Sequence, residues 1–244
     1  MVLLGLAGLF QPLVAWGLVG VLALFGAWGL RSWPLRLDIG ILSWFRGFLN
    51  LSWQFAALLA MLLAYSIGYL IVALSPTVEA DSLAGYLLTA TEYARQGAIT
   101  SVDYAYTDSQ PANGQMLSVL GLLLRDQILA QLLVIWLMGL LGLAVIYAIG
   151  RTWMDWRATL VAAVVWYGMF SISYLATSAK IDLAWAGFDL LAILAFSRWY
   201  FAERQERDWR LLLLTGLFLG VAGGIKQASA FTIVGLSVGL AFRL

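Results

Sequence analysis

Long apolar segments dominate this chain, and they restrict it to folds that a bilayer can hold. A helix that crosses the hydrocarbon core needs about 20 apolar residues. Segments of that length occur at about 3–30, 53–75, 127–149, 158–177 and 181–200. The stretch 210–242 is long enough for two shorter spans, about 210–224 and 227–242, separated at Gly223 to Gln227. The sequence therefore predicts an all-α, polytopic transmembrane helix bundle with about seven spans.

The composition supports this class and narrows the chemistry. Hydrophobic residues make up 63% of the chain and charged residues only 11%, whereas soluble domains carry about 25% charged residues. The chain contains no histidine and no cysteine. Imidazole and thiolate metal sites and serine–histidine catalysis are therefore excluded, so that a general base must be a carboxylate, a lysine or a tyrosine. The net charge of +1 gives no indication of a nucleic-acid partner.

Arginines and lysines divide unevenly between alternate loops. If the loop after the first span is cytoplasmic, that side carries Arg31, Arg36, Arg46, Arg151, Arg157, Arg198, Arg204, Arg207, Arg210 and Arg243. The other side carries Arg95, Arg125, Lys180 and Lys226. Because cytoplasmic loops are enriched in basic residues, this bias predicts that residues 76–126 form a large extracytoplasmic loop.

This predicted loop contains two short amphipathic or apolar segments. Pro76 ends the second span, because proline cannot continue a helical hydrogen-bond ladder. Residues 82–97 have apolar side chains at helical spacing and a polar opposite face, and Gly97 is a suitable C-terminal stop. A second short helix is predicted at about 114–124. We expect both helices to lie flat at the membrane interface, where lipid head groups are.

Acidic residues at the start of this loop allow two interpretations each. Asp81 directly precedes the first amphipathic helix, so that it is either the N-cap of that helix or a catalytic carboxylate at the membrane surface. Glu79 either shares acid–base work or is a solvated loop charge.

Charged residues at the external ends of the later spans form a second candidate set. Lys180 and Lys226 either bind a phosphate or extend from the helix ends to the interface, with Lys180 paired to Asp182. Arg95 binds a phosphate or belongs to the wet face of its helix. Asp189 lies deeper in the predicted membrane region, where a carboxylate is either functional or bonded to a neighbouring helix.

The order of these features resembles one class of membrane enzyme. The stretches that carry the resemblance are Pro76–Leu83, Glu92–Ile99, Gln110–Leu117, Ala179–Ala184 and Gly220–Lys226. Together they resemble the GT-C class of integral-membrane glycosyltransferases, in particular bacterial relatives of protein O-mannosyltransferases and aminoarabinose transferases. The chain departs from many relatives in one place, where Gly85-Tyr86 replaces a Tyr-His pair.

The resemblance implies an activity and a set of site residues. The implied reaction moves a sugar from a polyprenyl-phosphate carrier to a lipid, glycan or protein acceptor, with inversion at the anomeric carbon and with Asp81 as general base. The implied substrate-binding residues are Lys226, Lys180, Asp182, Glu79, Tyr86, Arg95 and Gln115. No cofactor is implied, although oxygen ligands leave a divalent metal open.

The resemblance also gives expectations about organisation and location. We expect residues 1–244 to form a single transmembrane domain with 76–126 as its catalytic loop, and the C-terminal part of the family fold to be missing. The expected location is the bacterial inner membrane. Two alternatives stay open: a secondary transporter that uses intramembrane Asp182 and Asp189, and a non-catalytic membrane scaffold.

Overall fold

The computed structural model describes residues 1–32, 52–105, 107, 110–203 and 208–243, and these residues form helices joined by turns, without a strand among them. The basic positions Arg36, Arg46, Arg204 and Arg207 lie outside the described residues. The helices are α1 Val2–Leu6, α2 Pro12–Ser32, α4 Trp53–Ala73, η1 Ser82–Tyr86, α5 Leu87–Gln96, α6 Gln115–Leu124, α7 Gln127–Gln131, η2 Leu132–Leu137, α8 Met138–Trp153, α9 Trp156–Gly168, α10 Phe170–Leu175, α11 Asp182–Phe201, α12 Trp209–Gly223 and α13 Ser229–Ala241. The predicted all-α class is confirmed.

Three described helices are long and apolar enough to cross a membrane. They are Pro12–Gly29, Trp53–Ala73 and the continuous helix Gln127–Trp153, which includes α7, η2 and α8. Helices α12 and α13 are apolar but shorter, and α11 contains Asp189 and Arg198 within its length. The chain is therefore a helical membrane protein, and the count of seven spans stays a prediction.

The N-terminal span was predicted too long. A helix was expected over residues 3–30, but α1 ends at Leu6 and α2 begins only at Pro12. Gly8 has a φ of 68° between them, in the left-handed region that glycine tolerates. The backbone N–H of buried Phe10 donates to the carbonyl of Gly97 at 2.9 Å, so tertiary contact with the end of α5 stabilises the break.

The predicted span 158–177 is also interrupted. Helix α9 ends at Gly168, Met169 is extended, and α10 begins at Phe170. The Tyr69 hydroxyl of α4 donates to the Tyr167 carbonyl at 2.9 Å. The Tyr167 carbonyl at the end of α9 thus accepts a hydrogen bond from a side chain of α4. In an apolar environment, each backbone polar group needs such a partner.

The two short helices predicted for the external loop are present. Residues 82–96 are helical through η1 and α5, and Gly97 ends α5 with a φ of 74°. Helix α6 matches the second predicted segment. We call α1, η1, α5 and α6 the cap. Buried residues of the cap, including Ala90, Tyr93, Met116 and Val119, form an apolar core together with Phe10 from the link between α1 and α2.

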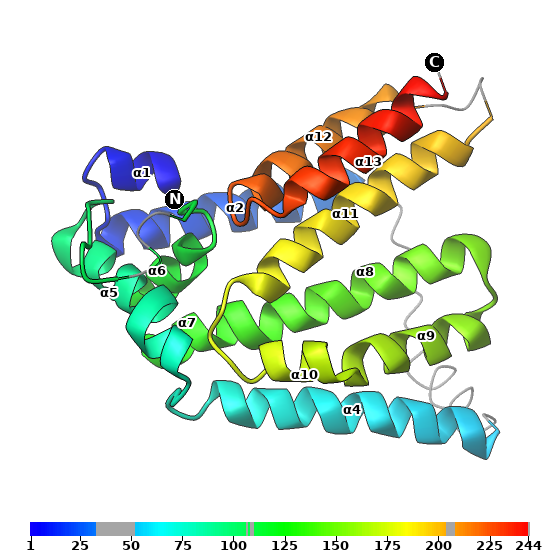
Figure 1. Cartoon of the computed structure of the whole chain (residues 1–244), viewed down its shortest axis with the longest axis horizontal. Helices are drawn as coiled ribbons and strands as arrows, with labels where there is room; N and C mark the ends of the chain where they lie inside the picture. Colours follow the sequence, from blue (N-terminus) through cyan, green and yellow to red (C-terminus); the bar gives the residue numbers. More distant parts are fainter. Residues whose placement is uncertain (33–51, 106, 108–109, 204–207, 244) are drawn as a thin grey trace.

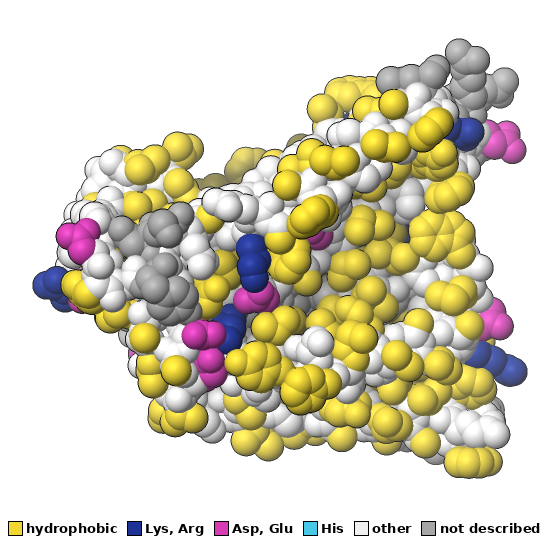
Figure 2. Space-filling view, viewed as in Figure 1, with side chains coloured by type: hydrophobic (Ala, Val, Ile, Leu, Met, Phe, Trp, Pro, Cys, Tyr) yellow, Lys and Arg dark blue, Asp and Glu magenta, His cyan; other side chains and the backbone are white. Residues whose placement is uncertain are grey.

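The cap occupies one end of the molecule. In Figure 1 it lies on the left with the N-terminus, while the α8–α9 turn, the end of α11 and the C-terminus lie on the right. Apolar side chains cover much of the face between these ends, and charged side chains gather near the cap and at the far end (Figure 2). The arrangement agrees with loops that alternate between two sides of a bilayer.

Close contact between α6 and α7 gives a prediction about stability. A Cβ atom at Gly121 would lie inside van der Waals contact with the backbone of Ala130 and 2.9 Å from the Leu129 carbonyl carbon. Backbone cannot rotate away, so Gly121→Ala should destabilise the protein by about 1–3 kcal/mol. Gly216→Ala is the matched control, since no atom lies within 4 Å of its Cβ position. Thermal unfolding in detergent should show a lower midpoint for Gly121→Ala only, and equal midpoints would contradict the packing.

Candidate active site

The Asp81 carboxylate lies at the start of η1, just beyond the end of α4. Its side chain is 53% exposed, so solvent or a substrate can reach it. It makes no capping hydrogen bond to η1. Glu79 takes that place, because its Oε2 accepts from the Ser82 N–H at 2.7 Å and from the Ser82 hydroxyl at 2.8 Å. The N-cap interpretation therefore fits Glu79 and not Asp81, and Glu79 is not a free loop charge.

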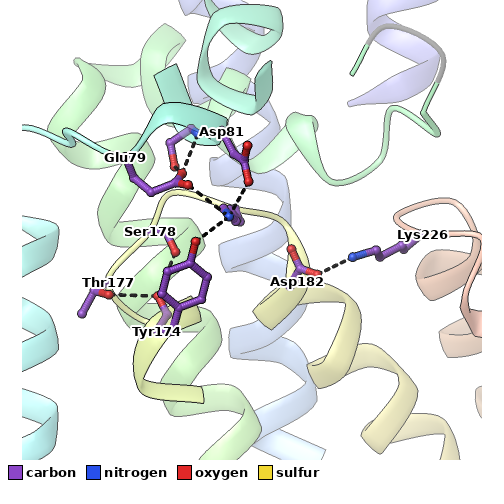
Figure 3. Close-up of polar contacts among 9 residues, drawn as sticks. Glu79, Asp81, Tyr174, Thr177, Ser178, Asp182 and Lys226 are labelled. Carbon is purple, nitrogen blue, oxygen red and sulfur yellow. Dashed lines mark hydrogen bonds and ion pairs between the residues drawn. The ribbon is translucent and has the colours of Figure 1, made fainter. Parts of the chain in front are cut away.

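The Lys180 ammonium joins both carboxylates to the later helices. Lys180 lies in the link between α10 and α11, and its Nζ is 2.7 Å from Asp81 Oδ2 and 3.1 Å from Glu79 Oε1. It also donates to the Tyr174 hydroxyl at 3.1 Å (Figure 3). The Lys180 side chain is only 9% exposed. The predicted Lys180–Asp182 pair is wrong, because Lys180 turns to residues about a hundred positions earlier in the chain.

The charges of this group are fixed by their mutual contacts. Burial by itself lowers the pKa of Lys180, but hydrogen bonds with Asp81, Tyr174 and Glu79 outweigh it and raise the pKa above its ordinary value. Burial raises the pKa of Glu79, but the Ser82 and Lys180 hydrogen bonds outweigh it and lower the pKa. Lys180 is therefore a cation and Glu79 an anion throughout the neutral pH range.

A second ion pair lies beside the first. Asp182 is the first residue of α11, and its carboxylate pairs with Lys226 from the turn between α12 and α13 (Figure 3). The Lys226 Nζ also lies 5.3 Å from the centroid of the Trp185 ring, within range of a cation–π contact. Lys226 remains about a third exposed.

Lys226 faces a pocket of about 290 Å³. The lining residues are Gln110, Pro111, Ile225, Lys226, Gln227 and Ala228. The segment before α6 forms one wall, because the Asn113 N–H donates to the Gly224 carbonyl at 3.0 Å. Gly224 permits this close approach, since a Cβ there would lie 2.7 Å from Asn113 Cγ. The pocket thus lies between the segment before α6 and the turn between α12 and α13.

The other predicted binding residues have different positions. Tyr86 is buried and packs in the main core of the bundle with Tyr69, Met138 and Ile181. Burial and the Asp182 charge raise the pKa of the Tyr86 phenol, although Lys226 and a hydrogen bond to Gln110 act in the opposite direction. Tyr86 therefore lies within electrostatic range of the second ion pair.

Gln115 and Arg95 have local structural contacts. Gln115 is buried, and with its amide oriented to donate, it bonds the carbonyls of Pro111 and Ala112 at 3.2 and 3.3 Å. It therefore shapes the wall of the pocket. Arg95 lies on the exposed face of α5 and pairs with Glu92 at 2.6 Å. The described contacts thus place Arg95 on the wet face of its helix.

Asp189 ties two helices together within the apolar region. Its two oxygens accept from the Ser229 hydroxyl at 3.0 Å and the Thr232 hydroxyl at 2.8 Å. Trp185 Nε1 donates to the same Ser229 hydroxyl at 2.8 Å. Asp189 therefore bonds to a neighbouring helix, and the network fixes the start of α13 at Ser229, after the turn that carries Lys226.

Some functional neighbours could not be found by sequence reasoning. Tyr174 and Trp185 contact the two lysines, but both lie in apolar segments where an aromatic residue carries no particular signal. Among the residues that the structure describes, no three acidic side chains come together as a possible metal site.

Comparison with known proteins identifies the family. Residues 110–243, more than half of the chain, match the model of the dolichyl-phosphate-mannose-protein mannosyltransferase family. The chain belongs to this family. It is therefore a membrane glycosyltransferase of the GT-C type, related to mannosyltransferases. This membership favours an enzyme over the transporter and scaffold alternatives. No curated protein and no solved structure matched the chain.

The matched region covers only part of the candidate site. It includes the pocket wall at Gln110, the Lys180 and Asp182 positions and Lys226. Glu79, Asp81 and Tyr86 precede it. The Asp81 carboxylate contacts the matched region through its hydrogen bond with Lys180.

Proposed function

We propose that this mannosyltransferase-family protein transfers a sugar from a polyprenyl-phosphate carrier to an acceptor at the extracytoplasmic membrane surface, with Asp81 as general base. One observation carries the proposal. A half-exposed carboxylate is held by a buried lysine at one end of an apolar bundle, beside a pocket with a second lysine. This combination offers a base and a phosphate-binding cation at the level where a lipid-linked sugar phosphate would lie.

The reaction follows from these two groups. The Asp81 carboxylate takes the proton of an acceptor hydroxyl while the acceptor oxygen forms a bond to the anomeric carbon. The bond between that carbon and the phosphate oxygen breaks on the opposite side of the sugar. The bonding electrons leave with the polyprenyl phosphate, and the configuration at the anomeric carbon is inverted. Each step uses side chains of the chain itself.

Lys226 suits the leaving group. Negative charge grows on the bridging phosphate oxygen as the bond breaks, and a preorganised cation stabilises such charge. Lys226 is partly exposed and faces the pocket, while its ammonium contacts the Asp182 carboxylate and the Trp185 ring. The apolar surface of the bundle next to this end accommodates the polyprenyl chain. Gln110 and Gln227 offer amide groups to the sugar hydroxyls.

A donor panel tests the proposal. The protein would be reconstituted in nanodiscs and supplied with labelled hexoses linked to polyprenyl phosphate, to polyprenyl diphosphate and to a nucleotide diphosphate. We expect release or transfer of sugar from the polyprenyl monophosphate donor alone. Turnover of the nucleotide sugar instead, in protein with confirmed membrane insertion, would refute the donor class.

A further inference from the structure

Glu79 and Lys180 have their hydrogen-bonding groups directed inward, away from a substrate. One Glu79 oxygen accepts two hydrogen bonds from Ser82, and the other is 3.1 Å from the Lys180 ammonium. Because both oxygens are engaged with the protein, the Glu79 carboxylate is in a poor position to take a proton from an acceptor. The Glu79 hydrogen bonds to Ser82 fix the start of η1, and Asp81 directly precedes this helix.

The Lys180 ammonium also has hydrogen-bond acceptors within the protein for each of its protons. An ammonium has three protons to donate, and three oxygens lie within reach, at 2.7 Å from Asp81, 3.1 Å from Glu79 and 3.1 Å from Tyr174. The Lys180 side chain is nearly buried, and the Tyr174 ring centroid lies 4.9 Å from the ammonium. A donor phosphate would have to displace one of these oxygens to bind Lys180.

The two lysines therefore differ in what they present to a ligand. Among the residues that the structure describes, Lys226 has one carboxylate partner and faces the pocket, whereas Lys180 has two carboxylates and a phenol around it. Two anions against one cation leave the Lys180 group with a net negative charge, which repels the negatively charged donor phosphate. The Lys226 pair is neutral, and it is the more favourable of the two for an anion.

We propose that Lys180 and Glu79 are positioning residues, which hold the Asp81 carboxylate toward the acceptor, and that Lys180 is not a ligand of the donor phosphate. This inference rests on the proposed role of Asp81 as base. Lys180 fixes one Asp81 oxygen from the α10–α11 link, and Glu79 together with Tyr174 fixes Lys180. The arrangement extends from α10 to the start of η1, so that it aligns the cap with the bundle.

The charges around Asp81 give a second readout. Lys180 places a positive charge beside the Asp81 carboxylate, and Glu79 adds a second negative charge to the group. Among the described residues, the other ionisable groups nearby are Tyr174 on α10, Tyr86 on η1, and the Asp182–Lys226 pair, which contributes no net charge. Removing Lys180 should therefore move the acid limb of the activity profile to higher pH, and neutralising Glu79 should have the opposite effect.

Binding and pH profiles test the inference together. Parent, Lys180→Met, Lys180→Arg and Glu79→Gln would be compared in nanodiscs, with Lys226→Met as the phosphate-site reference. Arg125→Met is the control for loss of an external cation, since the Arg125 side chain is 78% exposed. The first probe is decaprenyl phosphate, whose Kd is measured directly. The second readout is the pH dependence of kcat/KM for transfer from a decaprenyl-phosphate hexose.

We expect Lys180→Met to bind decaprenyl phosphate within threefold of the parent, while Lys226→Met binds it at least tenfold more weakly. The acid limb of kcat/KM should move up by about one pH unit in Lys180→Met and return in Lys180→Arg. In Glu79→Gln it should move to lower pH, because the amide oxygen still accepts from Ser82 but the negative charge is gone. If Lys180→Met does not insert into the membrane, the pH profile of Glu79→Gln tests the inference instead.

Two results would overturn the inference. A loss of lipid-phosphate binding of tenfold or more in Lys180→Met would make Lys180 a phosphate ligand. A loss of kcat without any movement of the acid limb, in the Lys180 and Glu79 variants alike, would make both residues merely structural. Either result leaves the proposed function intact, whereas full activity of Asp81→Asn would refute the base itself.

Discussion

Asp81→Asn should reduce sugar transfer by about a thousandfold, within the 10²–10⁴ range that general base catalysis contributes. Asparagine has the same shape as aspartate and still accepts a hydrogen bond from Lys180, but it cannot take up the acceptor proton. The local packing should survive, because the Asp81 side chain is half exposed and does not cap η1. Initial rates of transfer from a polyprenyl-phosphate hexose give the measurement.

Asp103→Asn is the matched control for this change. Asp103 is an exposed carboxylate in the segment between α5 and α6 and accepts from the Ser101 hydroxyl at 2.5 Å. It lies outside the proposed machinery, so its variant should transfer sugar at the parental rate. Equal rates for Asp81→Asn and Asp103→Asn, with equal membrane insertion, would remove Asp81 from the mechanism.

Lys226→Met should raise the KM for the lipid-linked donor by about ten- to a hundredfold. A hydrogen bond to a charged group is worth about 1.5–3 kcal/mol, and each 1.4 kcal/mol changes an equilibrium constant by about tenfold. Methionine is an unbranched side chain of similar length, but it supplies no charge to the phosphate, to Asp182 or to the Trp185 ring. Lys226→Arg should recover most of the affinity, because a guanidinium also binds phosphate.

The kinetic pattern separates this role from a general loss of structure. Loss of a donor ligand raises KM and weakens binding of decaprenyl phosphate in parallel, with the thermal midpoint close to that of the parent. A Lys226→Met protein with parental KM would contradict the assignment of the pocket. A lower thermal midpoint together with unchanged binding would point to the Asp182 pair as a structural contact only.

Much of the helical layout could be predicted because apolar length and glycine positions are local properties. The segments 53–75, 127–149 and 181–200 correspond to α4, to the helix from α7 through α8, and to α11. Gly97 ends α5 in the left-handed conformation that its sequence position predicts. The breaks at Gly8 and Met169 were missed, because contacts with Gly97 and Tyr69 far along the chain stabilise them.

The ion pairs also depend on contacts between residues far apart in the chain, which local sequence does not predict. Lys180 and Asp182 are two positions apart, and residues at that spacing do not face each other on a helix. Their partners come from Asp81 and Lys226, at separations of 99 and 44 residues. The sequence identifies which charges lie near helix ends, but only tertiary structure determines which of them meet. Gln115 illustrates the converse, because its polarity is used inside the protein.

The configuration of the product tests the central claim most directly. A decaprenyl-phosphate hexose of defined anomeric configuration, labelled with ¹³C at the anomeric carbon, would be incubated with the reconstituted protein and an acceptor alcohol. The one-bond carbon–proton coupling of the product gives its configuration. A single displacement with Asp81 as base predicts inversion, with one decaprenyl phosphate released for each sugar transferred. Retention of configuration would contradict it, because retention requires a second displacement at the anomeric carbon.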